Sequence, residues 1–127
     1  MQHLFKIFLF LIPFQIATAQ QTVTIYGEIH NPGSGKVYIK YLENYLTNDK
    51  AYADSALIDQ NGNFSMAFPW NKSFPAVFIY GDERTVMFLS PADSMKITVD
   101  AKQFYKTIKY ENKGAEANNY LAQKSLL

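Results

Sequence analysis

Short stretches that alternate between apolar and polar residues, separated by turn residues, run through most of this chain. Residues 22–29 alternate in this way, and Gly27 in their middle predicts a bulge or a close approach of another backbone. Residues 36–42 alternate as well, and the Asn-Pro-Gly-Ser-Gly sequence at 31–35 is a strong turn signal. We expect these two runs to pair as a β-hairpin.

A second hairpin is expected at residues 53–68. Residues 55–58 form one short run, and the alternation of Phe64, Met66 and Phe68 predicts a half-buried strand. Between them lies a turn at 59–63, with glycine and asparagine residues that tolerate positive φ. This segment lacks the ligand spacing of an EF-hand calcium loop, so we interpret it as a turn.

Further short strands follow. Residues 76–80 and 86–89 are continuous apolar runs joined by a turn at 81–84, and they are typical of strands covered on both faces. Residues 95–99 alternate again, and residues 104–111 are expected to form one more strand. The pattern predicts an all-β fold, an antiparallel β-sandwich of about seven or eight short strands.

The ends of the chain follow different patterns. Residues 1–19 combine a basic start, a short apolar core and a small-x-small exit at Ala17-Thr18-Ala19, which indicates a secretory signal peptide. The alternative is an N-terminal membrane anchor, but the apolar run is shorter than the roughly 20 residues of a spanning helix. We therefore expect export to the periplasm or cell envelope, with no integral membrane segment after cleavage. Residues 20–113 would form the sandwich domain. Residues 114–127 are expected to form a C-terminal α-helix that either docks on the sandwich or leads into an absent domain.

Charge and cysteine content narrow the function. The chain has 12 basic and 11 acidic residues, and loss of the signal peptide removes one basic residue, so the mature chain is formally neutral. Nucleic-acid binding would leave a basic patch, so we expect no nucleic-acid partner. The chain has no cysteine, which excludes disulfides, thiol chemistry and thiolate metal sites. A core must provide the stability, and 48% hydrophobic residues supply one.

No pattern in the sequence indicates a catalytic, cofactor or metal site. His3 lies in the signal peptide, and His30 has no partner in sequence for a triad or a metal site. Asp82 and Glu83 are adjacent acids in a turn, where solvated charge is the ordinary interpretation. We therefore predict that the chain is not an enzyme.

Aromatic residues in loops and at strand ends are the best candidates for a surface contact. We predict Trp70, Phe74, Tyr45 and Tyr52 as contact residues, with Trp70 and Phe74 first because they lie in the loop at 69–75. The alternative is that most of these aromatics pack in the core. Separately, the Asp-Ser-apolar sequences at Ser55 and Ser94 resemble acceptor sites of some envelope O-glycosylation systems.

Four segments occur in an order that resembles a known domain: residues 24–29, 54–64, 88–94 and 114–121. Together they are similar to the N-terminal domain that precedes a thioredoxin-like domain in many TlpA-like thiol:disulfide oxidoreductases of bacterial envelopes. One departure is Ala92, which stands where that family usually has glycine in a Pro-Gly-Asp-Ser turn, so we expect a changed turn type here.

The resemblance implies a non-catalytic accessory domain. In those proteins a Cys-x-x-Cys motif lies in the following domain, and this chain has no cysteine, so no catalytic residue is carried over. The implied partner is an adjoining thioredoxin-like domain or another protein. The alternative hypothesis is a solitary envelope module that binds glycan or peptide through its aromatic residues.

Overall fold

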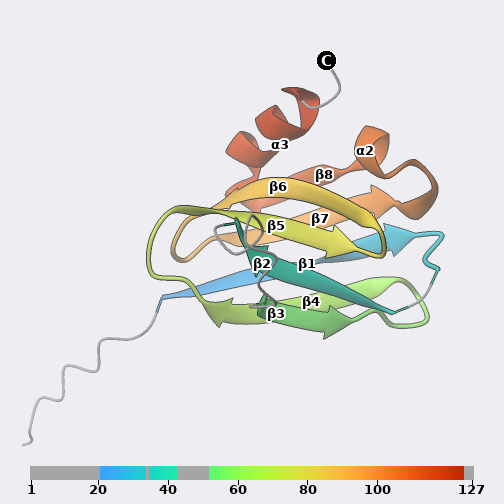
Figure 1. Ribbon diagram of the computed structural model, residues 1–127, viewed down its shortest axis with the longest axis horizontal. Helices are drawn as coiled ribbons and strands as arrows, with labels where there is room; N and C mark the ends of the chain where they lie inside the picture. Colours follow the sequence, from blue (N-terminus) through green and yellow to red (C-terminus); the bar gives the residue numbers. More distant parts are fainter. Residues whose placement is uncertain (1–20, 34, 43–51, 125–127) are drawn as a thin grey trace, which may run out of the picture.

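The computed structural model describes residues 21–33, 35–42 and 52–124, which form a β-sandwich with a helix along one side (Figure 1). Its strands are β1 (Thr22–His30), β2 (Lys36–Tyr41), β3 (Tyr52–Leu57), β4 (Asn63–Pro69), β5 (Phe74–Tyr80), β6 (Glu83–Leu89), β7 (Ser94–Asp100) and β8 (Lys109–Lys113). Its helical segments are the 3-10 turn η1 (Ala101–Gln103), α2 (Phe104–Thr107) and α3 (Ala115–Lys124). The predicted all-β class with a C-terminal helix is confirmed.

Two four-stranded sheets pack against each other. The first sheet has the order β4-β1-β7-β8, and the second has the order β3-β2-β5-β6. The pairing of β1 with β7 is parallel, whereas the other strand pairs in the described part of the chain are antiparallel. The inward-facing residues of both sheets form one apolar core. No helix within these described ranges is long and apolar enough to cross a membrane.

Both hairpins expected in the first half of the chain are wrong. Strands β1 and β2 lie in different sheets, and so do β3 and β4, which make up the stretch at 53–68. Each connecting turn carries the chain from one sheet to the other, so the apolar faces meet across the core. Phe64 of β4 thus packs against Phe78 of β5, with 5.9 Å between ring centroids. A turn signal marks the reversal of the chain but does not say whether the next strand pairs or crosses over.

The turn at 59–63 itself forms as the sequence indicates. The Asp59 carboxylate accepts the backbone N–H groups of Asn61 and Asn63 at 2.8 and 2.9 Å. Gly62 has a φ of +84°, and its carbonyl accepts the N–H of Ile29 at 2.8 Å. The Asp59 carboxylate therefore serves to shape a turn.

Gly27 is explained by a close approach of another backbone. It lies opposite Ile97 of the parallel neighbour β7, and a Cβ at Gly27 would overlap the Ile97 carbonyl. Of the two alternatives predicted for this glycine, a bulge or a close approach of another backbone, the close approach is confirmed.

The pair formed by β5 and β6 is the hairpin that the sequence placed correctly, with a turn at 81–82. Strand β5 is buried on both faces from Ala76 to Tyr80. Strand β6 is not, because it lies at the edge of the second sheet and exposes alternate residues. The expectation that both runs are covered on two faces is wrong for β6.

The segment predicted as one strand over 104–111 is divided into α2 and β8. The Asp100 carboxylate accepts the N–H of Lys102 at 2.9 Å, which starts a helical turn. In α2, which follows, the Thr107 hydroxyl donates to the Gln103 carbonyl at 2.8 Å. This helical segment places the Phe104 ring in the core. The free energy gained by burying the ring exceeds what a continuous strand would gain from its hydrogen bonds.

Candidate functional site

The tryptophan predicted as a surface contact is buried. Trp70 is 4% exposed, and its ring stacks on Tyr41 with 5.1 Å between centroids and 5° between planes. Its indole N–H donates to the Leu89 carbonyl at 3.1 Å. Its backbone N–H donates to the Gln21 carbonyl, so the pairing of β4 with β1 continues past the end of β4. Trp70 therefore extends the series of inward-facing residues that Phe68 precedes.

Phe74 is half-buried at the start of β5. Its ring lies 6.5 Å from that of Trp70, and the Lys72 ammonium lies 5.2 Å from the Phe74 centroid. With Tyr41, Pro69 and Asn71, these residues line a shallow depression. Because Tyr41 covers one face of the Trp70 ring, Phe74 is the aromatic that this depression offers most directly to a ligand.

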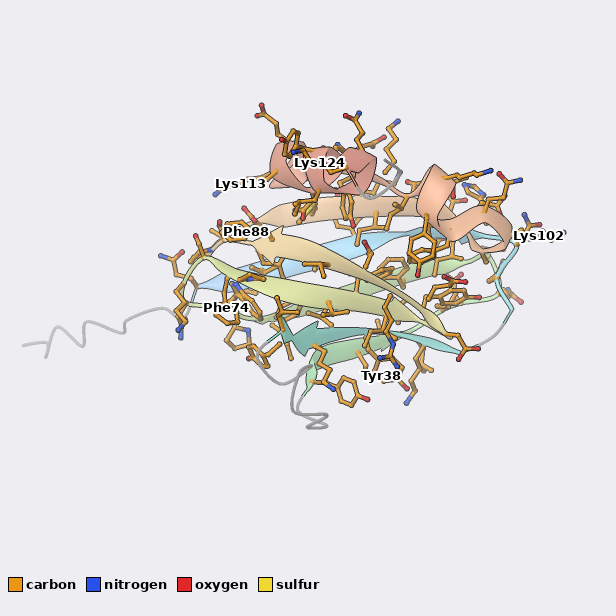
Figure 2. All side chains as sticks on the ribbon, turned by 45° about the horizontal axis from the view of Figure 1, so that its top comes forward. Tyr38, Phe74, Phe88, Lys102, Lys113 and Lys124 are labelled. Atoms are coloured by element: carbon orange, nitrogen blue, oxygen red, sulfur yellow. The ribbon has the colours of Figure 1, made fainter. Side chains whose placement is uncertain are left out.

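The remaining predicted contact residues lie elsewhere. Tyr52 is exposed on β3, 5.1 Å from Tyr38, with the Lys40 ammonium 5.8 Å from its ring centroid. Tyr45 lies outside the described residues. In Figure 2, Phe74 lies at one end of the second sheet and Tyr38 toward the other. The predicted contact residues are therefore not gathered into one site.

Two titratable side chains in the described ranges, Asp100 and Tyr110, have shifted pKa values with structural causes. No group of three or more His, Cys, Asp or Glu residues within those ranges is placed to hold a metal ion. The pKa of Asp100 is lowered because the Lys102 N–H and the Asn31 side chain donate hydrogen bonds to it. Burial raises the pKa of the Tyr110 hydroxyl, and a hydrogen bond with Thr85 opposes this shift. These groups cap a turn and pack a core, respectively.

The two serines of the Asp-Ser sequences are both accessible. Ser55 lies on the edge strand β3, and Ser94 begins β7. The Asp54 carboxylate accepts the Ser55 N–H at 2.8 Å and leaves the hydroxyl outside this bond. Glycosylation of either serine stays a prediction.

The most developed polar arrangement joins α3 to the second sheet. Asn118 is 1% exposed, and its Oδ1 accepts the N–H of Phe88 at 2.7 Å. Its Nδ2 donates to the carbonyls of Phe88 and Gly114, each at 2.9 Å. A carboxamide carries both an acceptor and a donor, so it pairs with one residue of an edge strand as a neighbouring strand would.

Asn119 does the same for the first sheet. Its Oδ1 accepts the Tyr110 N–H at 2.9 Å, and its Nδ2 donates to the Tyr110 carbonyl at 2.8 Å. Consecutive helical residues point about 100° apart, so one side chain reaches β6 and the next reaches β8. We call Asn118 and Asn119 the asparagine clamp. It attaches α3 across the edges of both sheets.

The start of α3 also contacts the turn before β7. Asp93 is buried, and its carboxylate accepts the Ser90 N–H at 2.8 Å. A Cβ at Gly114 would lie 2.7 Å from the Asp93 Oδ2, so glycine leaves room for this carboxylate. Ala92 has a φ of +66°, so the turn keeps its left-handed residue, and the expected change of turn type is wrong.

Two of the segments behind the family resemblance therefore meet at one corner. The segment 88–94 contains the end of β6 and the turn that follows it. It contacts the segment 114–121 in two places: the Asp93 carboxylate lies against Gly114, and Asn118 binds the backbone of Phe88. Neither Asn118 nor Asn119 is among the site residues predicted from the sequence. A pair of asparagines inside a helix is the available signal, because asparagine is a poor helix former unless its side chain has a specific partner.

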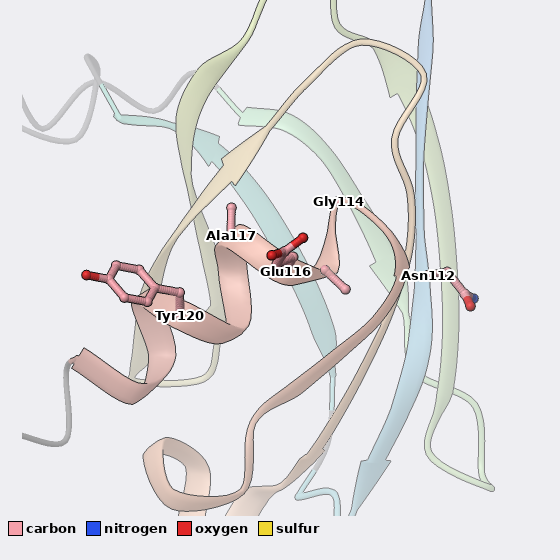
Figure 3. A pocket seen from close by; sticks show the side chains of 6 residues that line it. Asn112, Gly114, Glu116, Ala117 and Tyr120 are labelled. Carbon is pink, nitrogen blue, oxygen red and sulfur yellow. The ribbon is translucent and has the colours of Figure 1, made fainter.

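The exposed large apolar side chains are unevenly distributed over the described residues. Two of them lie on α3, Tyr120 (57% exposed) and Leu121 (38%), and two lie on β6, the strand that α3 contacts, Val86 (49%) and Phe88 (37%). We call these four residues the β6–α3 surface. The clamp places α3 along β6, and Leu121 follows Asn118 by almost one turn on the same side. A shallow hollow lies along the start of α3, and Gly114, Glu116 and Tyr120 are among the residues that line it. Figure 3 shows the Tyr120 ring projecting from the helix at this hollow.

The first sheet has a different outer face. Its outward positions on β1 and β7 hold mainly polar or charged side chains, including Thr24, Glu28, Lys96 and Thr98. None of the exposed large apolar residues of the described chain lies on this sheet. Within the described residues, the exposed large apolar side chains therefore lie on the second sheet and on helices α2 and α3.

Comparison with known proteins identifies a family. A model for a domain of unknown function, DUF4369, matches residues 23–121, a range that runs from the second residue of β1 through β8 and into most of α3. Neither the comparison with curated proteins nor that with solved structures gives a match. Because the matched region covers well over half of the sequence, the chain belongs to the DUF4369 domain family.

Proposed function

We propose that this chain is an exported, non-catalytic domain that acts by protein contact, as the accessory domain of a TlpA-like thiol:disulfide oxidoreductase. The β6–α3 surface supports this proposal most directly, because a cluster of exposed apolar side chains is typical of an interaction surface. The four resembling segments and their order supply the link to TlpA-like proteins. The cysteine-free chain would contribute binding or positioning, and the partner would contribute the thiols.

The partner is a thioredoxin-like domain, either adjoining in the same polypeptide or separate. Its contact with the β6–α3 surface would bury Phe88 and Leu121 at the centre. The surrounding charges include Lys124, whose ammonium lies 5.3 Å from the Tyr120 ring centroid. An apolar centre with a charged rim is the usual arrangement of a protein interface.

A binding measurement tests this proposal. The purified protein is titrated with the thioredoxin-like domain of a TlpA-like protein from the same organism, by calorimetry. We expect saturable binding that weakens at least tenfold when Phe88→Thr and Leu121→Gln are combined. The matched control is Thr24→Ala with Thr98→Ala on the outer face of the first sheet, which should leave binding unchanged. Absence of binding, or equal loss in both variants, would contradict the proposal.

Export is proposed with it and has its own test. Expression of the full chain in a Gram-negative host, followed by fractionation and N-terminal sequencing, should place the protein in the envelope with Gln20 as its first residue. A cytoplasmic protein that retains Met1 would contradict export.

The alternative is a glycan- or peptide-binding module, which the depression around Trp70 and Phe74 favours. A ligand there would approach Phe74 and Lys72 and change the environment of the neighbouring tryptophan. Titration with envelope glycans and peptides, followed by tryptophan fluorescence, should then saturate, and Phe74→Ala should abolish the response. If no titrant changes the fluorescence, this alternative fails, whereas the thioredoxin-domain titration is unaffected.

A further inference from the structure

Helix α3 buries little apolar surface. The buried residues of α3 are Ala115 and Asn118, with Ala122 partly buried. Its large apolar residues, Tyr120 and Leu121, are exposed instead. Alanine methyl groups contribute far less burial than leucine or phenylalanine side chains, so packing alone holds this helix weakly.

The asparagine clamp supplies four hydrogen bonds that attach α3 to specific backbone groups of the two sheets. Asn118 and Asn119 each bond both backbone groups of one edge residue, Phe88 and Tyr110, respectively. When the helix leaves, water replaces these partners on both sides, so the net free energy of each bond is small. The attachment is geometrically specific and energetically modest.

The junction before α3 is suited to movement. Gly114 has a φ of +102° and separates β8 from α3, and glycine accepts a wide range of backbone angles. The central strands β1, β7, β2 and β5 are each paired on both sides, and none of them relies on α3 for its backbone partners. The sheets therefore keep their ladders when the helix is displaced.

We infer that α3 is a detachable strap: it undocks as a unit, through Gly114, while both sheets stay folded. Undocking frees the N–H and carbonyl groups of Phe88 and Tyr110 at the same time, because both are attached to the same helix. The closed strap protects two sheet edges that would otherwise present unpaired backbone groups to another strand. This inference does not depend on the proposed function.

Native-state hydrogen exchange by NMR tests the inference on the full protein. We expect the amides of Phe88 and Tyr110 to exchange together with those of α3, with little dependence on denaturant. The amides of Ile25 and Ile97, in the central strands β1 and β7, should exchange only through global unfolding. A single exchange free energy for all four amides would overturn the inference.

Three variants separate local opening from global unfolding. Asn118→Ala with Asn119→Ala should speed exchange at Phe88 and Tyr110 by roughly tenfold or more, because about two net hydrogen bonds of ordinary strength are lost at each. The matched control Asn71→Ala, at an exposed loop position, should leave the exchange rates of Phe88 and Tyr110 unchanged.

The third variant, Met66→Ala, removes core packing from β4, at the far edge of the first sheet from β8. It should speed exchange of the central strands while Phe88 and Tyr110 keep their wild-type rates. Equal acceleration of central and strap amides by Met66→Ala would show that α3 belongs to the global unit, and the inference would fail.

Discussion

Replacing Asn118 by aspartate removes the donor half of one clamp residue without changing its size. In the wild type, Nδ2 donates to the carbonyls of Phe88 and Gly114, and Oδ1 accepts the Phe88 N–H. A carboxylate keeps the acceptor role but has no hydrogen to donate. Its second oxygen would face the two carbonyls that the amide now satisfies, in a site that is 1% exposed.

The expected loss of stability follows from these contacts. Two donated hydrogen bonds are worth about 1 kcal/mol each, and leaving the carbonyls unpaired beside a buried charge adds about 1–3 kcal/mol. We expect the free energy of unfolding to fall by about 3–5 kcal/mol at neutral pH. The loss cannot exceed the free energy of undocking α3, because the helix then leaves and the carboxylate becomes hydrated.

The loss should depend on pH in a defined direction. Burial without a donor raises the pKa of the introduced aspartate in the folded state above its unfolded value of about 3.9. A group with a raised folded pKa destabilises the fold fully above that pKa and ceases to do so below the unfolded value. The difference between wild type and Asn118→Asp should therefore shrink as the pH falls from 7 toward 4, since the protonated acid can donate one hydrogen bond.

Urea unfolding followed by circular dichroism at pH 7 and pH 4.5 measures both quantities. Asn119→Asp is the matched control, because Asn119 makes the same pair of bonds but is only half-buried, so its loss should be smaller. The reasoning is refuted if Asn118→Asp costs less than about 1 kcal/mol at pH 7, or if its cost is equal at both pH values.

Three further substitutions test the packing that supports the site. Gly27→Ala should cost about 3 kcal/mol in urea unfolding, because its methyl group overlaps a carbonyl of β7, whereas the methyl group of Gly33→Ala meets the Tyr80 hydroxyl at an ordinary contact distance of 3.6 Å and should cost little. Ala92→Gly should stabilise the protein by about 0.5–1 kcal/mol, since the left-handed φ of +66° is unfavourable for alanine; an unchanged melting temperature would contradict this. Trp70→Phe should cost about 2–3 kcal/mol by leaving the Leu89 carbonyl unpaired and a small cavity, and a neutral result would mean that the bond contributes nothing.

Local patterns in the sequence predicted the elements better than their arrangement. The alternation of Phe64, Met66 and Phe68 located β4, and the glycine at position 27 located a backbone approach. Both signals concern one strand and its nearest neighbour, where the period of two and the absence of a side chain have direct consequences. Such signals are readable without knowing the rest of the fold.

The sheet order was beyond this reasoning for a physical reason. The apolar face of a strand is buried against the core whether the next strand in the chain pairs with it in the same sheet or lies in the opposite sheet. The alternation pattern is the same in both cases. The turns at 31–35 and 59–63 permit either outcome, and the whole core decides between them. The loop position of Trp70 misled in the same way, because the pairing of β4 with β1 extends one residue beyond the strand.

The segments that carry the family resemblance gain a structural explanation from the corner at α3. Asp93 occupies the space left by Gly114, and Asn118 holds the backbone of Phe88 from the same side. A catalytic motif would bring reactive side chains toward a common point, whereas these side chains are directed at backbone N–H and carbonyl groups. The shared pattern therefore specifies how the C-terminal helix is attached to the sandwich. A contact at the β6–α3 surface would depend on that attachment, because Leu121 and Tyr120 are placed by the helix and Phe88 by the strand that it clamps.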